Sequence, residues 1–310
     1  MTTRIETHDD LLDFYRMQTE PSDPGPHASA YEGLPREIPA LCAILHGLML
    51  HMWWIGKQTY GFTKEDLAEA GRDIIAEISL RTTADMLGKI FEFDPRPLSE
   101  ARDAQKRLVG NCRDYALLLV SILRHQGIPA RARTGTARYF FPDGSRLEDH
   151  WICESWNEAD GRWQQTDPQI DDVMRRAMKL TLDPTDLPED QFLTGWRCYD
   201  ELASGRVEAE AIGFPPEFCG MGYVLNKMLA DLVSLTGQEV HAWAGWGIGG
   251  PDGGTLPGDR ELALQMVDLL KAIDEPSALQ EARELVASHE RVKRPDGYDP
   301  GPFRMEWLDA

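Results

Sequence analysis

The sequence predicts a mixed α+β fold, in which a helix that begins near Cys112 is followed by an antiparallel β-hairpin. Helical segments are expected on both sides of this pair. Helix start and stop signals bound residues 112–126, and two aromatic-rich runs separated by a turn follow between residues 149 and 168. Elsewhere, apolar residues recur mainly at helical spacing.

Residues 1–34 are polar and contain three prolines between positions 21 and 26, which predicts an irregular N-terminal arm. Residues 35–100 show helical spacing of apolar residues and are interpreted as a helical N-terminal region. Within it, Ile38–Ile55 barely reaches the roughly 17 residues that span a bilayer and contains His46 and His51. We therefore expect a buried helix there rather than a membrane span.

Residues 101–180 form the predicted mixed core, which continues in helical style to residue 126, interrupted at Gly110 and Asn111, and then turns to short extended runs. Residues 181–310 are expected to form a helical region packed on this core, with helices over Tyr223–Leu235 and Glu261–Ile273. No internal repeat occurs at periods of 20 to 50 residues, which excludes a solenoid.

The helix after Gly110 has clear signals at both ends. Asn111 suits the N-cap, and Asp114 can bond back to it three residues later. Gly127 can adopt the left-handed C-cap conformation, and Pro129 prevents continuation. The predicted helix therefore runs from about residue 112 to 126.

Cys112 falls in the first turn of this helix. The partial positive charge and unpaired N–H groups there favour a thiolate, and the same N–H groups can stabilise an oxyanion on a substrate carbonyl. Taken alone, the cysteine is better explained as a small buried hydrophobic residue, which is the usual environment of a free cysteine. Its companions in the sequence favour the catalytic interpretation.

Two predicted strands, Asp149–Trp156 and Gly161–Pro168, are joined by a turn. Such a hairpin can hold His150 and Asp167 side by side, and Pro168 biases Asp167 towards an extended backbone. Read singly, His150 is also compatible with a structural strand histidine, and Asp167 with a turn residue.

Cysteine catalysis needs a base that accepts the thiol proton and a third group that orients the imidazole. Cys112, His150 and Asp167 supply these roles in chain order. A zinc site built from Cys112, His150 and Cys153 is disfavoured, because His150 and Cys153 lie three apart and face opposite sides of a strand. We expect neither a metal nor a cofactor.

The composition is that of an ordinary globular protein, with 42% hydrophobic and 27% charged residues. The 32 basic and 52 acidic residues give a net charge of −20, which repels nucleic acid and anionic lipid. No secretory signal is recognised at the start, so a cytoplasmic location is expected. The five cysteines are odd in number and lack CxxC pairing, which argues against a disulfide framework.

Three stretches resemble the core of the transglutaminase-like superfamily over about residues 75–172, namely GNCRDYALLLVSILRHQGIPARARTG, DHWICESW and GRWQQTDPQID. The resemblance implies a papain-like core, in which the nucleophile helix packs on an antiparallel sheet. It assigns Cys112 as nucleophile, His150 as base and acid, and Asp167 as the partner that orients the histidine. The flanks resemble those of stand-alone bacterial members, on the stretches LPREIPALCAILHGLMLH and LNKMLADLVSLTGQEVHAWAGWG.

The resemblance also implies an oxyanion partner upstream of the cysteine, for which Gln105 is the candidate. An exposed helix glutamine is the alternative. Trp151, beside the histidine, is a candidate wall of the acyl tunnel or else a core tryptophan. No EF-hand spacing is found that would carry a calcium dependence over.

These features predict acyl transfer through a Cys112 thioester to an amine acceptor, which forms an amide. A hydrolase, either a cysteine peptidase or an amidase, would use the same three residues if the acceptor site were open to water. A catalytically inactive binding or scaffold module is the third alternative. The expected partners are a small-molecule or peptide acyl donor and an amine, and the sequence does not indicate an oligomeric state.

Overall fold

The computed structural model describes residues 4–214 and 218–302. The chain divides into two compact units that alternate along the sequence. The cysteine unit contains Gln18–Ala130 and Ile152–Asp186. The histidine unit contains the chain up to Met17, Arg131–Trp151 and Leu187–Pro300. These units are built from alternating segments of the chain, whereas the sequence predicts consecutive regions. The predicted division into consecutive regions stays a prediction.

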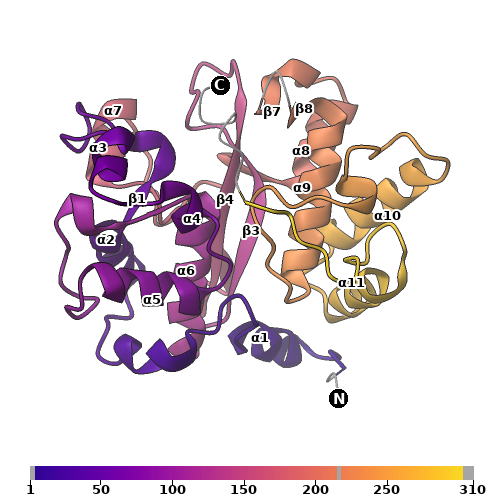
Figure 1. Cartoon of the computed structure of the whole chain (residues 1–310). Helices are drawn as coiled ribbons and strands as arrows, with labels where there is room; N and C mark the ends of the chain where they lie inside the picture. Colours follow the sequence, from indigo (N-terminus) through magenta and orange to yellow (C-terminus); the bar gives the residue numbers. More distant parts are fainter. Residues whose placement is uncertain (1–3, 215–217, 303–310) are drawn as a thin grey trace. The chain divides into compact units, whose positions relative to one another are not determined.

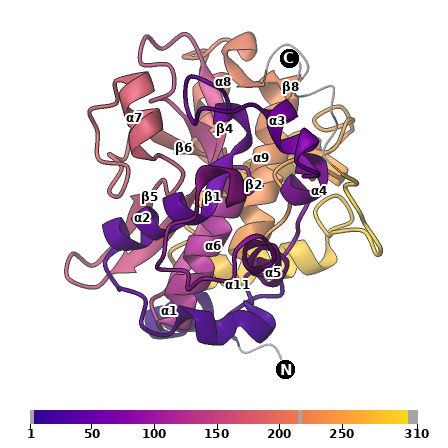
Figure 2. The same ribbon diagram turned by 60° about the vertical axis from the view of Figure 1, so that its left-hand side comes forward.

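The cysteine unit is built around α6 (Cys112–His125), whose residues from Cys112 to Arg124 are all buried. Helices α2 and α5 and the short strand β2 contact α6 (Figure 2). The other elements of this unit are η1 (Gly25–Tyr31), α2 (Ile38–Leu48), β1 (Met49–His51), η2 (Met52–Trp54), α3 (Lys64–Glu69), α4 (Ile74–Ile78), α5 (Thr83–Phe93), η3 (Ala104–Lys106), β2 (Leu108–Gly110), β5 (Arg162–Thr166) and α7 (Asp172–Met178).

In the histidine unit, helices α8 and α9 pack against the strands, and α10 and α11 pack on these helices (orange to yellow in Figure 1). The strand order is β6-β3-β4-β7-β8, in which β6 is antiparallel to β3 and β7 is parallel to β4. The elements are α1 (His8–Arg16), β3 (Ala130–Ala137), β4 (Leu147–Asn157), β6 (Phe192–Thr194), α8 (Gly195–Ala203), η4 (Ala209–Ala211), β7 (Ile212–Phe214), β8 (Phe218–Cys219), α9 (Gly220–Leu235), η5 (Gly247–Gly249), α10 (Asp259–Lys271) and α11 (Pro276–Ser288).

Strand β4 passes from the histidine unit into the cysteine unit after Trp151. Its second half pairs with β5 in an antiparallel hairpin, in which Trp156 lies opposite Trp163. Their rings pack edge to face, with centroids 5.6 Å apart. The predicted hairpin is therefore confirmed, and so is the α+β fold class.

The predicted buried helix over Ile38–Ile55 is wrong beyond Leu48, where α2 ends. The chain continues as strand β1, which pairs in parallel with β2, and Leu50 lies opposite Val109. The expected helical style of residues 101–110 is wrong for the same reason, since this stretch contains η3 and β2. The pairing of two short apolar strands overrides their local helical spacing.

The expected irregular arm is wrong for His8–Arg16, which form α1. The Thr7 side chain accepts a hydrogen bond from the Asp10 N–H at 3.1 Å, and Asp10 accepts one from the Thr7 N–H at 2.9 Å. This capping box satisfies backbone donors at the helix start. The Tyr15 hydroxyl then donates to the Leu235 carbonyl at 3.1 Å, which attaches α1 to α9.

The expected C-terminal helices form as α9 and α10. Strands β6, β7 and β8 occur in the same region and were not expected from the sequence. Within the described ranges, no helix combines the length and apolar character that crossing a bilayer requires.

Candidate active site

The capping geometry places Cys112 as the first residue of α6, as predicted. The Asn111 side chain accepts from the Arg113 N–H at 3.0 Å, and Asp114 accepts from the Asn111 N–H at 2.9 Å. Gly127 has a φ of 75° at the other end, and the Ile128 N–H donates to the Leu123 carbonyl at 2.9 Å. The helix therefore presents Cys112 at the terminus where backbone N–H groups lack carbonyl partners.

Strand β2 directly precedes this helix start and is held in place by buried side chains. Glu77 is buried and accepts from the Val109 N–H at 2.9 Å, while Arg72 donates to its carboxylate at 2.6 Å. A side chain at Gly110 would place its Cβ 2.6 Å from Met49 Cε and 3.1 Å from Asp114 Oδ2. Only glycine fits this approach without a shift of its neighbours.

Asp114 is a buried carboxyl group within the same helix start. Burial raises its pKa to about 6, against the lowering effect of the adjacent Arg113 charge. The Arg113 Nη1 lies 3.3 Å from Asp114 Oδ1, and its Nη2 donates to the Arg81 carbonyl at 2.9 Å. The first turn of α6 is thus held by several polar contacts and not by the backbone alone.

Asp167 directly follows β5 in the cysteine unit and is 1% exposed. Its N–H donates to the Pro184 carbonyl at 2.7 Å, and its Oδ1 accepts from the Gln169 N–H at 3.0 Å. His46 of α2 approaches the same turn, with Nε2 at 3.0 Å from the Pro168 carbonyl. These contacts fix the backbone on both sides of Asp167.

Cys42 and His46 bring α2 to this turn. Burial raises the pKa of the Cys42 thiol to about 12, and the charge of Asp167 adds to that effect. Burial lowers the pKa of His46, which Asp171 and the Pro168 carbonyl oppose. Neither residue was expected near Asp167 from the sequence, because helical spacing does not reveal which distant turn a helix contacts.

His150 lies on the part of β4 that belongs to the histidine unit and is 2% exposed. Its ring meets Phe140 at a centroid distance of 5.0 Å and an angle of 77°, and Tyr139 at 6.1 Å and 90°. Its carbonyl accepts from the Thr134 hydroxyl at 3.4 Å. The aromatic pair at 139 and 140, just after β3, is the signal that would have indicated this environment.

The structure places Cys112 and Asp167 in one compact unit and His150 in the other. His150 and Asp167 are close along the β4–β5 hairpin. Cys153, three residues after His150, pairs with Thr166, the residue before Asp167. The convergence of the three side chains stays a prediction.

The two auxiliary residues lie in different settings. Gln105 is exposed in η3, where its carbonyl accepts from Arg72 at 2.7 Å. Trp151 is fully buried, and the alternation of β4 directs it to the face opposite His150. The indole N–H of Trp151 has no acceptor among the described residues. Both assignments stay predictions, and the burial of Trp151 favours the core alternative.

Cys112 is 7% exposed, and three of the other four cysteines are also buried. Burial raises the pKa of Cys198 to about 12 and raises that of Cys153 well above its ordinary value. Cys219, at the end of β8, is half-buried. In the part of the chain that the structure describes, no group of three or more histidine, cysteine or acidic side chains could hold a metal ion.

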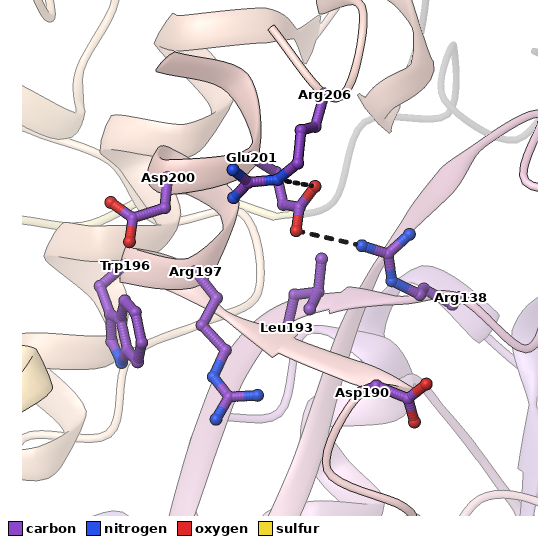
Figure 3. Close-up of a pocket in the computed structure, with 8 residues that line it drawn as sticks. All are labelled: Arg138, Asp190, Leu193, Trp196, Arg197, Asp200, Glu201 and Arg206. Atoms are coloured by element: carbon purple, nitrogen blue, oxygen red, sulfur yellow. Dashed lines mark hydrogen bonds and ion pairs between the residues drawn. The ribbon is translucent and has the colours of Figure 1, made fainter. Parts of the chain in front are cut away.

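A pocket of about 420 Å³ opens within the histidine unit between the end of β3 and helix α8 (Figure 3). Glu201 pairs with Arg138 at 3.4 Å and with Arg206 at 3.2 Å. Asp200 pairs with Lys271 at 3.1 Å, and the Lys271 ammonium lies 5.1 Å from the Trp196 ring centroid. Positive and negative charges alternate around this pocket, so its charge favours neither an anion nor a cation.

A family model matches part of the chain. Residues 63–168 match the model of the transglutaminase-like superfamily. A solved structure from Cytophaga hutchinsonii, described as a candidate cysteine protease, is 17% identical with a TM-score of 0.28, and the match covers 52% of this chain and 42% of that one. The chain thus spans less than half the length of that protein. None of the curated proteins matches the sequence.

Proposed function

Residues 63–168 belong to the transglutaminase-like superfamily, and from this premise we propose that the chain is a cysteine-dependent enzyme that transfers an acyl group to an amine. Cys112 is the proposed nucleophile, His150 the base and acid, and Asp167 the residue that orients the histidine. The observation that carries the proposal is the position of Cys112 within the matched segment, at the capped start of a buried helix.

In the first half of the proposed reaction, the Cys112 sulfur adds to the carbonyl carbon of the acyl donor, and the thiol proton passes to His150. N–H groups at the start of α6 stabilise the resulting oxyanion. The bond to the leaving group then breaks, and the leaving group takes the proton from His150. A thioester on Cys112 remains.

In the second half, the nitrogen of an amine attacks this thioester and gives its proton to His150. The carbon–sulfur bond breaks, which releases the amide. The proton on His150 then returns to the Cys112 thiolate. If water takes the place of the amine, the same steps release a carboxylic acid, and the enzyme is a hydrolase. The difference depends on access of water to the thioester.

The first test is reaction with iodoacetamide at pH 7, read by peptide mass spectrometry. Burial raises the pKa values of Cys42, Cys153 and Cys198, so we expect these thiols to stay protonated and to react slowly. Cys219→Ser removes the half-buried thiol and serves as the matched control for Cys112→Ala. We expect rapid labelling of Cys112 in the control and its loss in Cys112→Ala, whereas a Cys112 that labels no faster than Cys42, Cys153 and Cys198 contradicts the proposal.

The second test separates transfer from hydrolysis. The Cys219→Ser protein is incubated with a panel of carboxamide and thioester acyl donors, with and without a fluorescent primary amine, in ¹⁸O-labelled water. Amide product that requires the amine and Cys112 supports transfer. Carboxylic acid that carries ¹⁸O regardless of the amine identifies a hydrolase and contradicts the transferase assignment.

A further inference from the structure

Helix α9 is largely buried and carries a stripe of three polar or charged side chains on one face. Tyr223, Lys227 and Asp231 are four residues apart, so they share one face of the helix. All three are buried, and Lys227 is only 1% exposed. A lysine is rarely placed in such an environment unless an opposite charge pairs with it.

The stripe contacts β4, the strand that carries His150, and β3, the strand that pairs with β4. Lys227 Nζ lies 2.7 Å from Asp149 Oδ1 and donates to the Ala242 carbonyl at 3.2 Å. The Tyr223 hydroxyl lies 2.9 Å from the same Asp149 oxygen and 2.8 Å from the Gly135 carbonyl. Asp149 on β4 is therefore held by two groups from α9.

The third member of the stripe acts on β3. Asp231 accepts two hydrogen bonds from Arg133, from Nε and Nη2, each at 2.9 Å, and a third from the Thr134 N–H at 3.2 Å. The Thr134 hydroxyl in turn donates to the His150 carbonyl at 3.4 Å. Helix α9 is thus connected to the backbone at His150 in two ways: through its contacts with Asp149, the preceding residue, and through the hydrogen bonds of Thr134.

Strand alternation sets the geometry of these routes. Asp149 and His150 are consecutive on β4, so their side chains project to opposite faces. Asp149 faces α9, whereas the imidazole meets the rings of Tyr139 and Phe140. The stripe therefore holds the strand from the face behind the imidazole.

Other charges also act near His150. Glu148 lies two residues earlier on the same face of β4 and pairs with Arg146 at 2.8 Å. Burial raises the pKa of Glu148 to about 7, while the charges of Arg146 and His150 lower it. Arg133 and Asp231 form a buried ion pair whose opposite charges offset each other. Asp149 is the charged residue next to His150 on β4, and it pairs with Lys227.

We propose that Lys227, with Tyr223 and Asp231, is a positioning residue of the active site: it neutralises Asp149 and fixes the strand from which His150 projects. This inference rests on the proposed function for the role of His150 in the reaction. It adds that the charge state and orientation of the imidazole are controlled from α9, which is distant in sequence from every residue of the superfamily match.

The test follows the His150 ring signal by NMR as a function of pH, with His150→Gln to assign it. Lys227→Met leaves Asp149 without its cation, and we expect the His150 titration midpoint to rise by about 0.5 pH unit. Asp149→Asn leaves Lys227 without its anion, and we expect the midpoint to fall by a similar amount. The double variant should return close to the original midpoint, and Lys227→Arg should retain it.

Asp274→Asn is the matched control, because Asp274 pairs at 2.8 Å with Arg131, another buried arginine of β3. This change should lower stability without moving the His150 midpoint, which separates positioning from a general structural role. Midpoints that move equally in all variants, or in none, overturn the inference. The Cys112 labelling rate in His150→Gln is measured in parallel, so that failure of the proposed function is recognised separately.

Discussion

Asn111 and Asp114 exchange hydrogen bonds across the first turn of α6, and Cys112 lies between them. The pair satisfies backbone donors at the helix start and leaves the sulfur at the end of the helix. Cap residues of this kind each contribute about 1 kcal/mol to stability. The same contacts that stabilise the helix therefore also determine where the candidate nucleophile lies.

Asn111→Ala should lower the free energy of unfolding by about 1 kcal/mol and should slow the labelling of Cys112. Thr82→Ala is the matched control, since Thr82 caps α5 through the Asp85 N–H at 3.1 Å. Urea unfolding and iodoacetamide kinetics check both variants. Equal labelling rates in the two variants would show that the cap has no bearing on the cysteine.

The half-buried His46 predicts an acid-sensitive contribution to stability. Burial lowers the pKa of His46 in the folded protein below its unfolded value of 6.5, so the native state favours the neutral ring. Stability should therefore fall as the pH decreases through 6.5 towards the folded pKa. His46→Gln should reduce this loss between pH 7 and pH 5 in urea unfolding, whereas an unchanged slope would contradict the assignment.

Gly135 allows β6 to approach β3, because a Cβ at this position would lie 1.9 Å from the Leu193 carbonyl oxygen. Gly135→Ala should destabilise the protein by about 3 kcal/mol, at the upper end of the cost of overpacking. Gly222→Ala in α9 meets no atom within 4 Å and should be neutral or slightly stabilising. Thermal unfolding of both variants checks this, and similar melting temperatures would contradict the close approach.

The Arg133–Asp231 pair is buried on both sides. Removing one partner leaves an uncompensated charge, so Asp231→Asn should cost about 3–5 kcal/mol. Replacing both residues together, as in Arg133→Met with Asp231→Leu, should recover most of that loss. A double variant that is less stable than the single one would show that the pair itself stabilises the fold.

The sequence predicts the elements whose signals are local. Caps and a C-terminal glycine bound α6, and aromatic runs around a turn identify the β4–β5 hairpin. Strand β1 escapes prediction because a three-residue apolar strand shows no period of its own. Its partner β2 lies far along the chain, so only the folded structure reveals the pairing.

The candidate site, too, is predictable only where its signals are local. Cys112, His150 and Asp167 are recognised by residue type and local context, whereas the contacts of His150 with Phe140 and Thr134 depend on how strands pair. Helix α1 is a different case. Its Thr7–Asp10 capping box is visible in the sequence, but the prolines that follow favoured an irregular interpretation.

The proposed reaction requires the Cys112 sulfur and the His150 imidazole to act as one catalytic pair. The most direct measurement is the rate of Cys112 alkylation by iodoacetamide as a function of pH, compared between the Cys219→Ser protein and the same protein with His150→Gln. We expect the rate near pH 7 to fall at least tenfold in the histidine variant, because the thiol then ionises without a neighbouring imidazolium. Superimposable pH–rate profiles for the two proteins would contradict it.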